Sequence, residues 1–230
     1  MNDPTLARSG ARSTLSTKTI TTLAMLTGIA YVVMLLSKAL PSVNGFLDFD
    51  FKDVVICIGG FTFGPTAAAA VSVVVALIEM LTISTTGPIG MLMNVLATVS
   101  FCCTASFIYK KRHTMAGAVL GLSLGVAALT VMMLLWNYFI TPLYMNTPRE
   151  VVAAMLVPVF LPFNLVKGGM NMAATLLLYK PVVTALRRTG LVPPSTSHGQ
   201  NRRASAGFFL FALVLLATFI LFALVLWDVI

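Results

Sequence analysis

Long apolar runs, each bounded by a few polar or turn-forming residues, repeat along the whole chain. A helix needs roughly 20 such residues to cross a bilayer. The runs are continuous and lack the period-two alternation of membrane β-strands. The pattern therefore predicts an all-α integral membrane protein. The predicted spans cover residues 19–37, 53–64, 66–83, 88–109, 114–136, 157–180 and 207–227.

The second and third runs are separated only by Gly64-Pro65. We predict a tight turn here, because glycine frees the backbone and proline suits the first residue of a helix. The alternative is one long kinked helix, which would reverse the direction of every later span.

Four segments follow from this pattern. We expect an N-terminal tail at 1–18, a six-helix membrane domain at 19–188, a polar Pro/Ser-rich linker at 189–206, and an additional transmembrane helix at 207–230. The last run is uniformly apolar and shows no stripe of small residues of the kind that lets helices pack closely. It is typical of an appended anchor rather than of a binding site.

Composition and charge support a membrane protein. The chain is 58% hydrophobic and 10% charged, and its mean hydropathy is +0.96. A net charge of +8 would suggest nucleic acid as a partner of a soluble protein. Here most Lys and Arg residues fall in the tail, in the loop around Lys110, and after residue 179. By the positive-inside rule we predict these segments, and with them the N-terminus, to be cytoplasmic, and we expect no nucleic-acid partner.

The sequence offers no residues for catalysis. It has no phosphate-binding loop of the Gly-x-x-x-x-Gly-Lys-Ser/Thr type. Its two histidines, His113 and His198, fall in predicted cytoplasmic loops, and its three cysteines lie in apolar runs without metal-site spacing. We therefore predict neither an enzyme nor a metal or cofactor site.

Lys167 is the most informative residue, because it lies in an otherwise uncharged stretch from Val151 to Tyr179. A charge at this depth costs several kcal/mol unless it pairs or faces a polar cavity. Asn164 and Asn171 lie on the same helix face, at spacings i, i+3 and i+7. The alternative is that Lys167 pairs with Glu79, or with backbone carbonyls freed near the prolines that precede it.

Further amides are expected at the same depth. Asn94 and Asn137 fall near the same ends of their spans. An asparagine carries a donor and an acceptor side by side, which suits a ligand with an amide-like edge, such as a pyrimidine or flavin ring. Aromatic residues that could stack on the ring or cover it are Phe46, Phe49, Phe51 and Tyr138.

Small residues mark the first span. Ala24 and Gly28 form a small-xxx-small pair, which lets a second helix approach closely. This signal leaves internal packing and a partner interface equally open.

Several of these motifs together resemble the riboflavin-binding S component of energy-coupling-factor (ECF) vitamin transporters, over about residues 19–188. The resemblance rests on Ala24-x-x-x-Gly28, Leu47-Asp48-Phe49-Asp50-Phe51-Lys52-Asp53, Phe63-Gly64-Pro65, Gly87-Pro88-Ile89-Gly90 with Asn94, Asn137 with Pro142 and Tyr144, and Asn164-Leu165-Val166-Lys167-Gly168-Gly169. The last two are the most specific. The pattern departs from the family in Gly28, where alanine is expected, and in the seventh span.

The resemblance implies uptake of riboflavin across the cell membrane, through a six-helix core with an outward-facing pocket that the first outer loop covers. It also implies a membrane T component docking on Ala24 and Gly28, and two cytoplasmic ATPases. Together with the residue pattern it gives the expected binding residues Asn137, Asn164, Lys167, Asn94, Asp48, Phe49 and Tyr138. The alternatives are an S component for another vitamin or nucleobase-like solute, and a structural or regulatory membrane protein in which Lys167 pairs with Glu79.

Overall fold

The computed structural model describes residues 16–192 and 202–227, and over these residues the chain is helical. Residues 1–15 of the expected tail, 193–201 of the expected linker and 228–230 of the expected last helix lie outside the described residues. The helices are α1 (Thr17–Ser37), α2 (Lys52–Phe63), α3 (Pro65–Thr82), α4 (Gly87–Lys111), α5 (Met115–Phe139), α6 (Thr141–Met145), α7 (Arg149–Met155), α8 (Leu161–Arg188) and α9 (Arg202–Leu226), with a π-helical turn, η1 (Leu156–Phe160), between α7 and α8.

The predicted all-α membrane fold with a C-terminal span is confirmed. Within the described residues, six segments are long and apolar enough to cross a membrane: α1, α3, α4, α5, the continuous segment 149–188, and α9. The predicted second span is a helix, but α2 has only 12 residues. At 1.5 Å per residue it is about 18 Å long, short of a hydrocarbon core of roughly 30 Å. The preceding loop must therefore descend into the bundle to reach it.

The tight turn between α2 and α3 is also confirmed. Gly64 has a φ of 97°, which a residue with a side chain rarely adopts, and Pro65 is the first residue of α3. A single kinked helix is therefore excluded, and α2 and α3 run in opposite directions.

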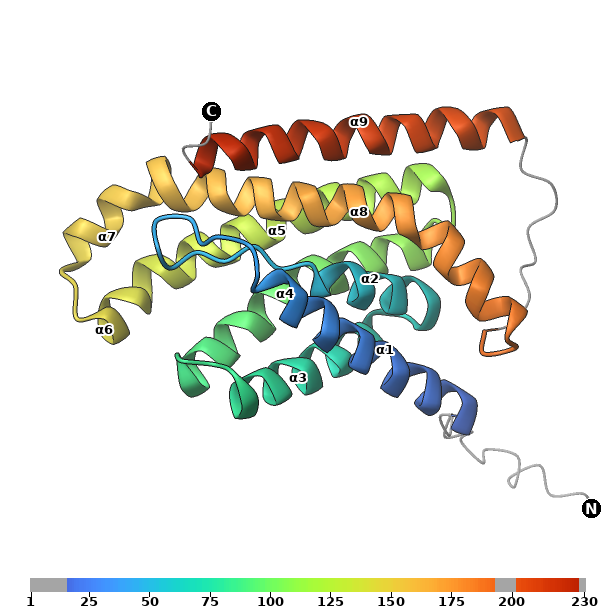
Figure 1. The fold of residues 1–230 in the computed structure, drawn as a ribbon, viewed down its shortest axis with the longest axis horizontal. Helices are drawn as coiled ribbons and strands as arrows, with labels where there is room; N and C mark the ends of the chain where they lie inside the picture. Colours follow the sequence, from blue (N-terminus) through green and yellow to red (C-terminus); the bar gives the residue numbers. More distant parts are fainter. Residues whose placement is uncertain (1–15, 193–201, 228–230) are drawn as a thin grey trace, which may run out of the picture.

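The bundle has two ends of different character (Figure 1). One end carries the connections 38–51, 83–86 and 140–148, and we call it the cavity end. The other carries the connections 112–114 and 189–192 together with Lys110, Lys111, Arg187 and Arg188, and we call it the basic end. α4 packs between α3 and α5, while α8 packs on α2, α5 and α9.

Helix packing is closest between α4 and α5. A Cβ at Gly121 would lie 2.7 Å from the carbonyl oxygen of Ala105, and a Cβ at Gly125 the same distance from that of Phe101. Within a membrane, helices associate through van der Waals contact rather than through removal of apolar surface from water. These glycines therefore fix how closely the two helices approach.

The sixth predicted span, 157–180, belongs to a longer segment. Helical structure begins at Arg149 and continues through η1 to Arg188. At η1 the backbone N–H of Leu161 donates to the carbonyl of Leu156, five residues earlier. Pro158 and Pro162 lack the N–H groups that α-helical hydrogen bonding would need here. The π-turn accommodates these missing hydrogen bonds without ending the helical segment. The apolar run predicts only the part of the helix that crosses the membrane, and the helical segment extends beyond that part at both ends.

α9 is packed more closely than the sequence pattern indicates. Ala212 and Ala223 on its inner face are buried against the bundle. Between them Phe219 lies over Gly169 of α8, where any Cβ would overlap its ring. The small residues needed for close approach are thus divided between α8 and α9, and α9 packs along α8.

Candidate functional site

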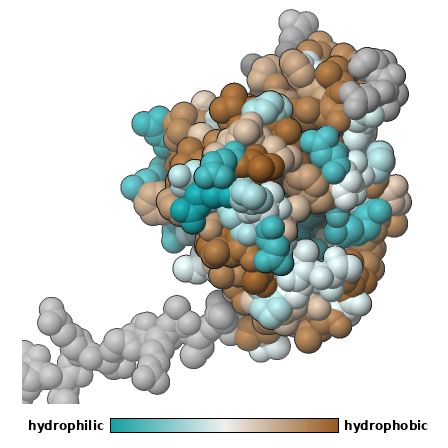
Figure 2. Space-filling view, turned by 90° about the vertical axis from the view of Figure 1, so that its left-hand side faces the viewer, coloured by the Kyte–Doolittle hydropathy of each residue, from teal (hydrophilic) through white to brown (hydrophobic). Residues whose placement is uncertain are grey.

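A cavity of about 400 Å³ lies at the cavity end, between the connection 38–51 and helices α3, α4, α5, α6 and α8. Figure 2 views this end and shows hydrophilic side chains gathered between apolar flanks. Its polar lining is Lys38, Ser42, Asp48, Asp50, Glu79, Ser84, Thr85, Thr86, Asn94, Asn137, Tyr144, Asn164 and Lys167. Its apolar lining includes Phe46, Leu47, Met93, Leu129, Met133 and Phe163. A mostly enclosed site with a few converging polar groups is typical of small-molecule binding.

One wall is the connection 38–51, which folds into a small hairpin. Val43 and Leu47 exchange backbone hydrogen bonds of 2.8 and 3.0 Å. Three residues lie between them. Asn44 and Gly45 have positive φ angles, 50° and 77°, and form the centre of a β-turn closed by the Phe46 N–H donating to the Val43 carbonyl at 3.3 Å. Asn-Gly is the preferred central pair for such a turn. The hairpin therefore gives this wall a defined shape.

Asp48 ties this hairpin to the end of α1. Its carboxylate accepts hydrogen bonds from Lys38 Nζ at 2.8 Å and from Ser42 Oγ at 2.6 Å. Burial by itself would raise the pKa of Asp48, but the bonds from Lys38 and Ser42 outweigh it, so this pKa lies below its ordinary value. The carboxylate is therefore charged and already partnered.

The same connection is held against α8. Asn171 Nδ2 donates to the carbonyl of Asp50 at 2.9 Å, and Lys167 Nζ lies 3.5 Å from the carbonyl of Asp48. Between these two attachments, Phe49 is buried against Phe163, with ring centroids 5.0 Å apart.

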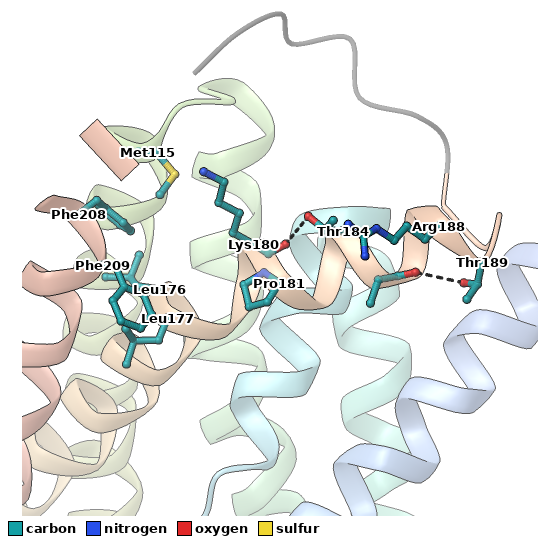
Figure 3. Close-up of a pocket in the computed structure, with 11 residues that line it drawn as sticks. Met115, Leu176, Leu177, Lys180, Pro181, Thr184, Arg188, Thr189, Phe208 and Phe209 are labelled. Atoms are coloured by element: carbon teal, nitrogen blue, oxygen red, sulfur yellow. Dashed lines mark hydrogen bonds between the residues drawn. The ribbon is translucent and has the colours of Figure 1, made fainter. Parts of the chain in front are cut away.

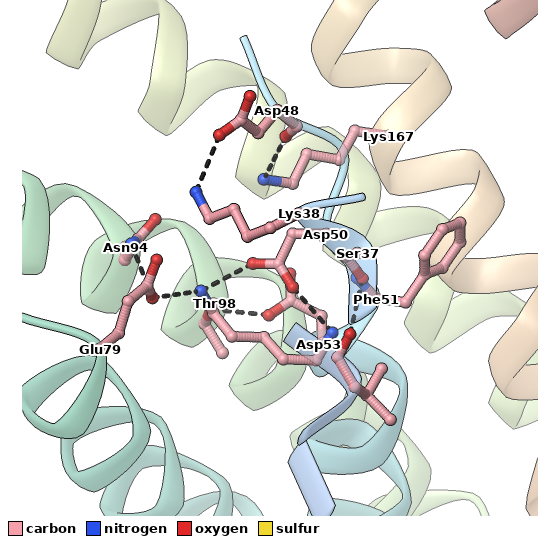
Figure 4. Close-up of polar contacts among 12 residues, drawn as sticks. Ser37, Lys38, Asp48, Asp50, Phe51, Asp53, Glu79, Asn94, Thr98 and Lys167 are labelled. Atoms are coloured by element: carbon pink, nitrogen blue, oxygen red, sulfur yellow. Dashed lines mark hydrogen bonds and ion pairs between the residues drawn. The ribbon is translucent and has the colours of Figure 1, made fainter. Parts of the chain in front are cut away.

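A buried charge network lies beneath the cavity (Figure 4). Lys52 Nζ lies 2.6 Å from Asp50 and 2.9 Å from Glu79, and its side chain is only 3% exposed. Asn94 Nδ2 also donates to Glu79, at 3.0 Å, while Asp53 accepts from Thr98 at 2.7 Å. Buried carboxylates need such partners, because an unpaired charge in this environment is very unfavourable.

Lys167 does not pair with Glu79, because Glu79 is held by Lys52 and Asn94. Within the part of the chain that the structure describes, Lys167 donates one long hydrogen bond, to the Asp48 carbonyl, and its side chain lines the cavity. The ammonium therefore retains donor capacity on the cavity side, since it carries three N–H groups.

The side-chain NH₂ groups of the cavity asparagines donate hydrogen bonds within the protein, and their amide oxygens differ in whether they have a partner. Asn164 Nδ2 donates to the carbonyl of Phe160 at 2.7 Å, and Asn137 Nδ2 to that of Met133 at 2.8 Å. The oxygen of Asn137 accepts from Thr141 at 2.9 Å. The amide oxygens of Asn164 and Asn94 accept no hydrogen bond within the described residues, so they remain able to accept from a ligand.

The structure brings most of the expected binding residues together. Asn94, Asn137, Asn164, Lys167 and Asp48 all line the cavity. Two others lie elsewhere. Phe49 is buried between α8 and α9 rather than over the cavity, and Tyr138 lies at the surface beside Phe139 and Arg149. The expected interface residues Ala24 and Gly28 lie on the exposed face of α1.

Two features of the site were missed in the sequence. The predicted second span begins at residue 53 and so leaves Lys52 in the preceding loop, whereas the structure buries Lys52 in the first turn of α2. The Asn44-Gly45 pair is the strongest short hairpin signal known, and it predicts the turn that the structure contains.

A larger cavity of about 730 Å³ lies at the basic end, between α8, α9 and the start of α5 (Figure 3). Its lining is mainly apolar, with Leu176, Leu177, Phe208 and Phe209, and its cationic residues are Lys180 and Arg188. It lacks the converging amides of the cavity end, so size alone does not identify it as the solute site.

The electrostatics of the cavity end favour an uncharged polar ligand. The carboxylates of Asp48, Asp50 and Glu79 are each paired with a lysine, Lys38 or Lys52. The groups with spare capacity are the Lys167 ammonium and the amide oxygens. These groups can bind a flat ligand by hydrogen bonds to its carbonyls and N–H groups.

Comparison with known proteins identifies the family. The model of the family "ECF transporter, substrate-specific component" matches residues 18–179. The chain is 32% identical to the riboflavin transporter RibU of Staphylococcus aureus (strain TCH60) over 177 residues, which are 74% of this chain and 93% of that protein. It is 32% identical to the riboflavin transporter FmnP of Bacillus subtilis (strain 168) over 160 residues, 66% of this chain and 84% of that protein.

The fold is similar as well. A solved structure described as "Structure and mechanism of the S component of a bacterial ECF transporter" matches with a TM-score of 0.63 at 32% identity, covering 74% of this chain and 98% of that one.

Proposed function

The chain belongs to the substrate-specific (S) components of ECF transporters, which are multi-pass membrane binding proteins and not enzymes, and we propose that the solute it binds is riboflavin. The observation that carries this proposal is the convergence of Asn94, Asn137, Asn164 and Lys167 on one cavity. Similarity to two proteins named riboflavin transporters supports it.

The chemistry of the cavity matches a flavin. Riboflavin is neutral and planar, and one edge of its ring alternates carbonyl and N–H groups. The ring has one N–H on this edge, between two carbonyls. One of the amide oxygens of Asn94 and Asn164 accepts from that N–H and the other from a hydroxyl of the ribityl chain, while Lys167 donates to a ring carbonyl. The apolar lining residues Phe163 and Leu129 pack against the ring faces. The paired carboxylates offer no site for an additional negative charge.

We further propose that the basic end faces the cytoplasm and the cavity end faces outward from the cell membrane. Lys110, Lys111, Arg187 and Arg188 lie at the basic end, and such residues are retained on the cytoplasmic side. ECF S components act with an energising module. In this proposal that module consists of a membrane T component and two cytoplasmic ATPases, which drive import of the vitamin captured from outside.

Binding of riboflavin to the purified protein tests the assignment directly. We expect quenching of flavin fluorescence on binding, and weaker binding by Lys167→Ala and Asn164→Ala. Loss of a hydrogen bond from a charged donor corresponds to about 1.5–3 kcal/mol, or roughly a 10- to 100-fold rise in Kd, and loss of a neutral one to up to about tenfold.

The matched control is Lys110→Ala, which removes a lysine from an exposed position at the basic end. Membrane insertion and thermal unfolding of all three variants show that the protein still folds. Wild-type affinity in both cavity variants would refute the site. Binding of a different vitamin, with no flavin binding, would refute riboflavin but retain the cavity.

A further inference from the structure

α9 lies outside the region that the family model matches, which ends at residue 179. It nevertheless packs along α8 from the basic end to the cavity end (Figure 1). Its inner face carries Ala212, Phe219 and Ala223, which are spaced i, i+7 and i+11 and so share one side of the helix. The outer face carries Phe222 and Val225, which are 56% and 52% exposed.

The end of α9 reaches the wall of the cavity. Trp227 contacts Phe49 with ring centroids 5.2 Å apart and rings nearly perpendicular, at 83°. Phe49 is 1% exposed and lies between Trp227 and Phe163 of α8. Together with Val43, Val166, Met170 and Ala223 these rings form a separate apolar cluster. Edge-to-face aromatic contacts of this kind are favourable beyond their buried area.

Phe49 occupies a decisive position in the loop. Its neighbours Asp48 and Asp50 both line the cavity, so the position of Phe49 fixes both of them. The polar attachments of the loop to α8 are few: the 3.5 Å bond from Lys167 and the 2.9 Å bond from Asn171. The aromatic contacts are therefore a substantial part of what holds this wall against α8, while Lys38 and Lys52 hold Asp48 and Asp50.

We propose that α9 is a working part of the solute site, and that Trp227 is a positioning residue that clamps Phe49 and so keeps the loop 38–51 closed against α8. This proposal rests on the proposed function for the identity of the solute. Its consequence is kinetic: the clamp slows the escape of bound solute past the loop, while the groups that touch the solute stay the same.

The test uses the full chain with Trp227→Ala and Phe219→Ala, which weaken the clamp and the seat of α9 respectively. Two readouts are compared. The first is amide hydrogen exchange of residues 43–50 without ligand, where Val43 and Leu47 are protected by their mutual bonds. The second is the rate at which riboflavin dissociates, followed by flavin fluorescence. We expect exchange to be several-fold faster, and dissociation to be about three- to tenfold faster with little change in the association rate.

Two controls separate clamping from general damage. Phe222→Ala removes an aromatic ring from the exposed face of the same helix and leaves both readouts at wild-type values. Trp227→Phe retains a ring against Phe49, and the indole N–H of Trp227 has no partner within the described residues, so this variant restores slow exchange and slow dissociation.

Unchanged exchange in Trp227→Ala and Phe219→Ala would overturn the clamp. Faster exchange with an unchanged dissociation rate would overturn its role in the solute site. Absence of flavin binding in the wild type would refute riboflavin as the solute. Amide hydrogen exchange would still test whether Trp227 clamps Phe49, because that measurement is made without ligand.

Discussion

Lys52 balances the charges beneath the cavity, although it is not expected to touch the solute. It is the cationic partner of both Asp50 and Glu79, and all three side chains are largely buried. Removing one member of a buried ion network leaves the others uncompensated, which is far more unfavourable than the net contribution of the intact network. Glu79 and Asp50 in turn line the cavity, so Lys52 determines the charge that a solute meets.

We predict that Lys52→Met lowers the free energy of unfolding by about 3–5 kcal/mol, because Glu79 and Asp50 lose their cation. Thermal unfolding of the detergent-solubilised protein measures this loss. Lys38→Met is the matched control, since its pair with Asp48 is 43% and 37% exposed and such pairs contribute less than about 1 kcal/mol. Equal shifts for the two lysines would contradict the prediction.

The two lysines of the site also show what single-residue patterns can reveal. Lys167 is conspicuous in the sequence because its neighbours are uncharged, and it does line the cavity. Lys52 is inconspicuous in the sequence, because it lies among acidic residues in a segment whose pattern predicts a loop. Its burial depends on how deep α2 begins, and its partner Glu79 is 27 residues away. No local pattern encodes that pairing.

At the scale of helices, small residues determine which elements touch. Gly117, Gly121 and Gly125 recur every four residues along α5, and the latter two face the backbone of α4. This repeat is a known signal for close helix packing and predicts the α4–α5 contact. The α8–α9 contact is less predictable, because Gly169 lies on one helix while Phe219 and the flanking alanines lie on the other. The sequence pattern predicts the additional helix itself but not this contact with α8.

Gly125→Val is expected to separate α4 from α5. Its Cβ would lie 2.7 Å from the carbonyl oxygen of Phe101, and a backbone atom cannot move aside as a side chain can. We predict a loss of about 1–3 kcal/mol in unfolding free energy, or more, measured by thermal unfolding. Gly28→Val serves as the control, since a Cβ at Gly28 meets nothing within 4 Å. An equal loss at Gly28 would indicate a helix-propensity effect instead.

At the scale of the whole molecule, the site and the expected docking surface are separate. The cavity lies at one end, enclosed by the connection 38–51 and five helices, while Ala24 and Gly28 lie on the exposed side of α1, in the middle part of that helix. Solute capture and assembly with the energising module can therefore be disturbed independently. The sequence resemblance implied this division, and the exposure of both small residues supports it.

Ala24→Trp is therefore predicted to abolish assembly with the T component while riboflavin affinity stays at the wild-type value, because the indole fills the space that a partner helix needs. Co-purification with the energising module and flavin titration measure the two properties. Ile29→Trp places the same side chain at an exposed position on another side of α1 and should leave assembly intact. Unchanged co-purification of the Ala24 variant would place the docking surface elsewhere.

The π-turn between α7 and α8 also sets the phase of one helix relative to the other. An α-helix rotates by about 100° per residue, and η1 accommodates one residue more per turn than α-helical bonding does. α8 is fixed by its contacts with α2, α5 and α9. Deleting one residue within 156–160 would therefore rotate α7, and with it the segment carrying Tyr144 and Met145, which line the cavity. The number of residues in this turn thus determines the orientation of the residues that form the rim of the site.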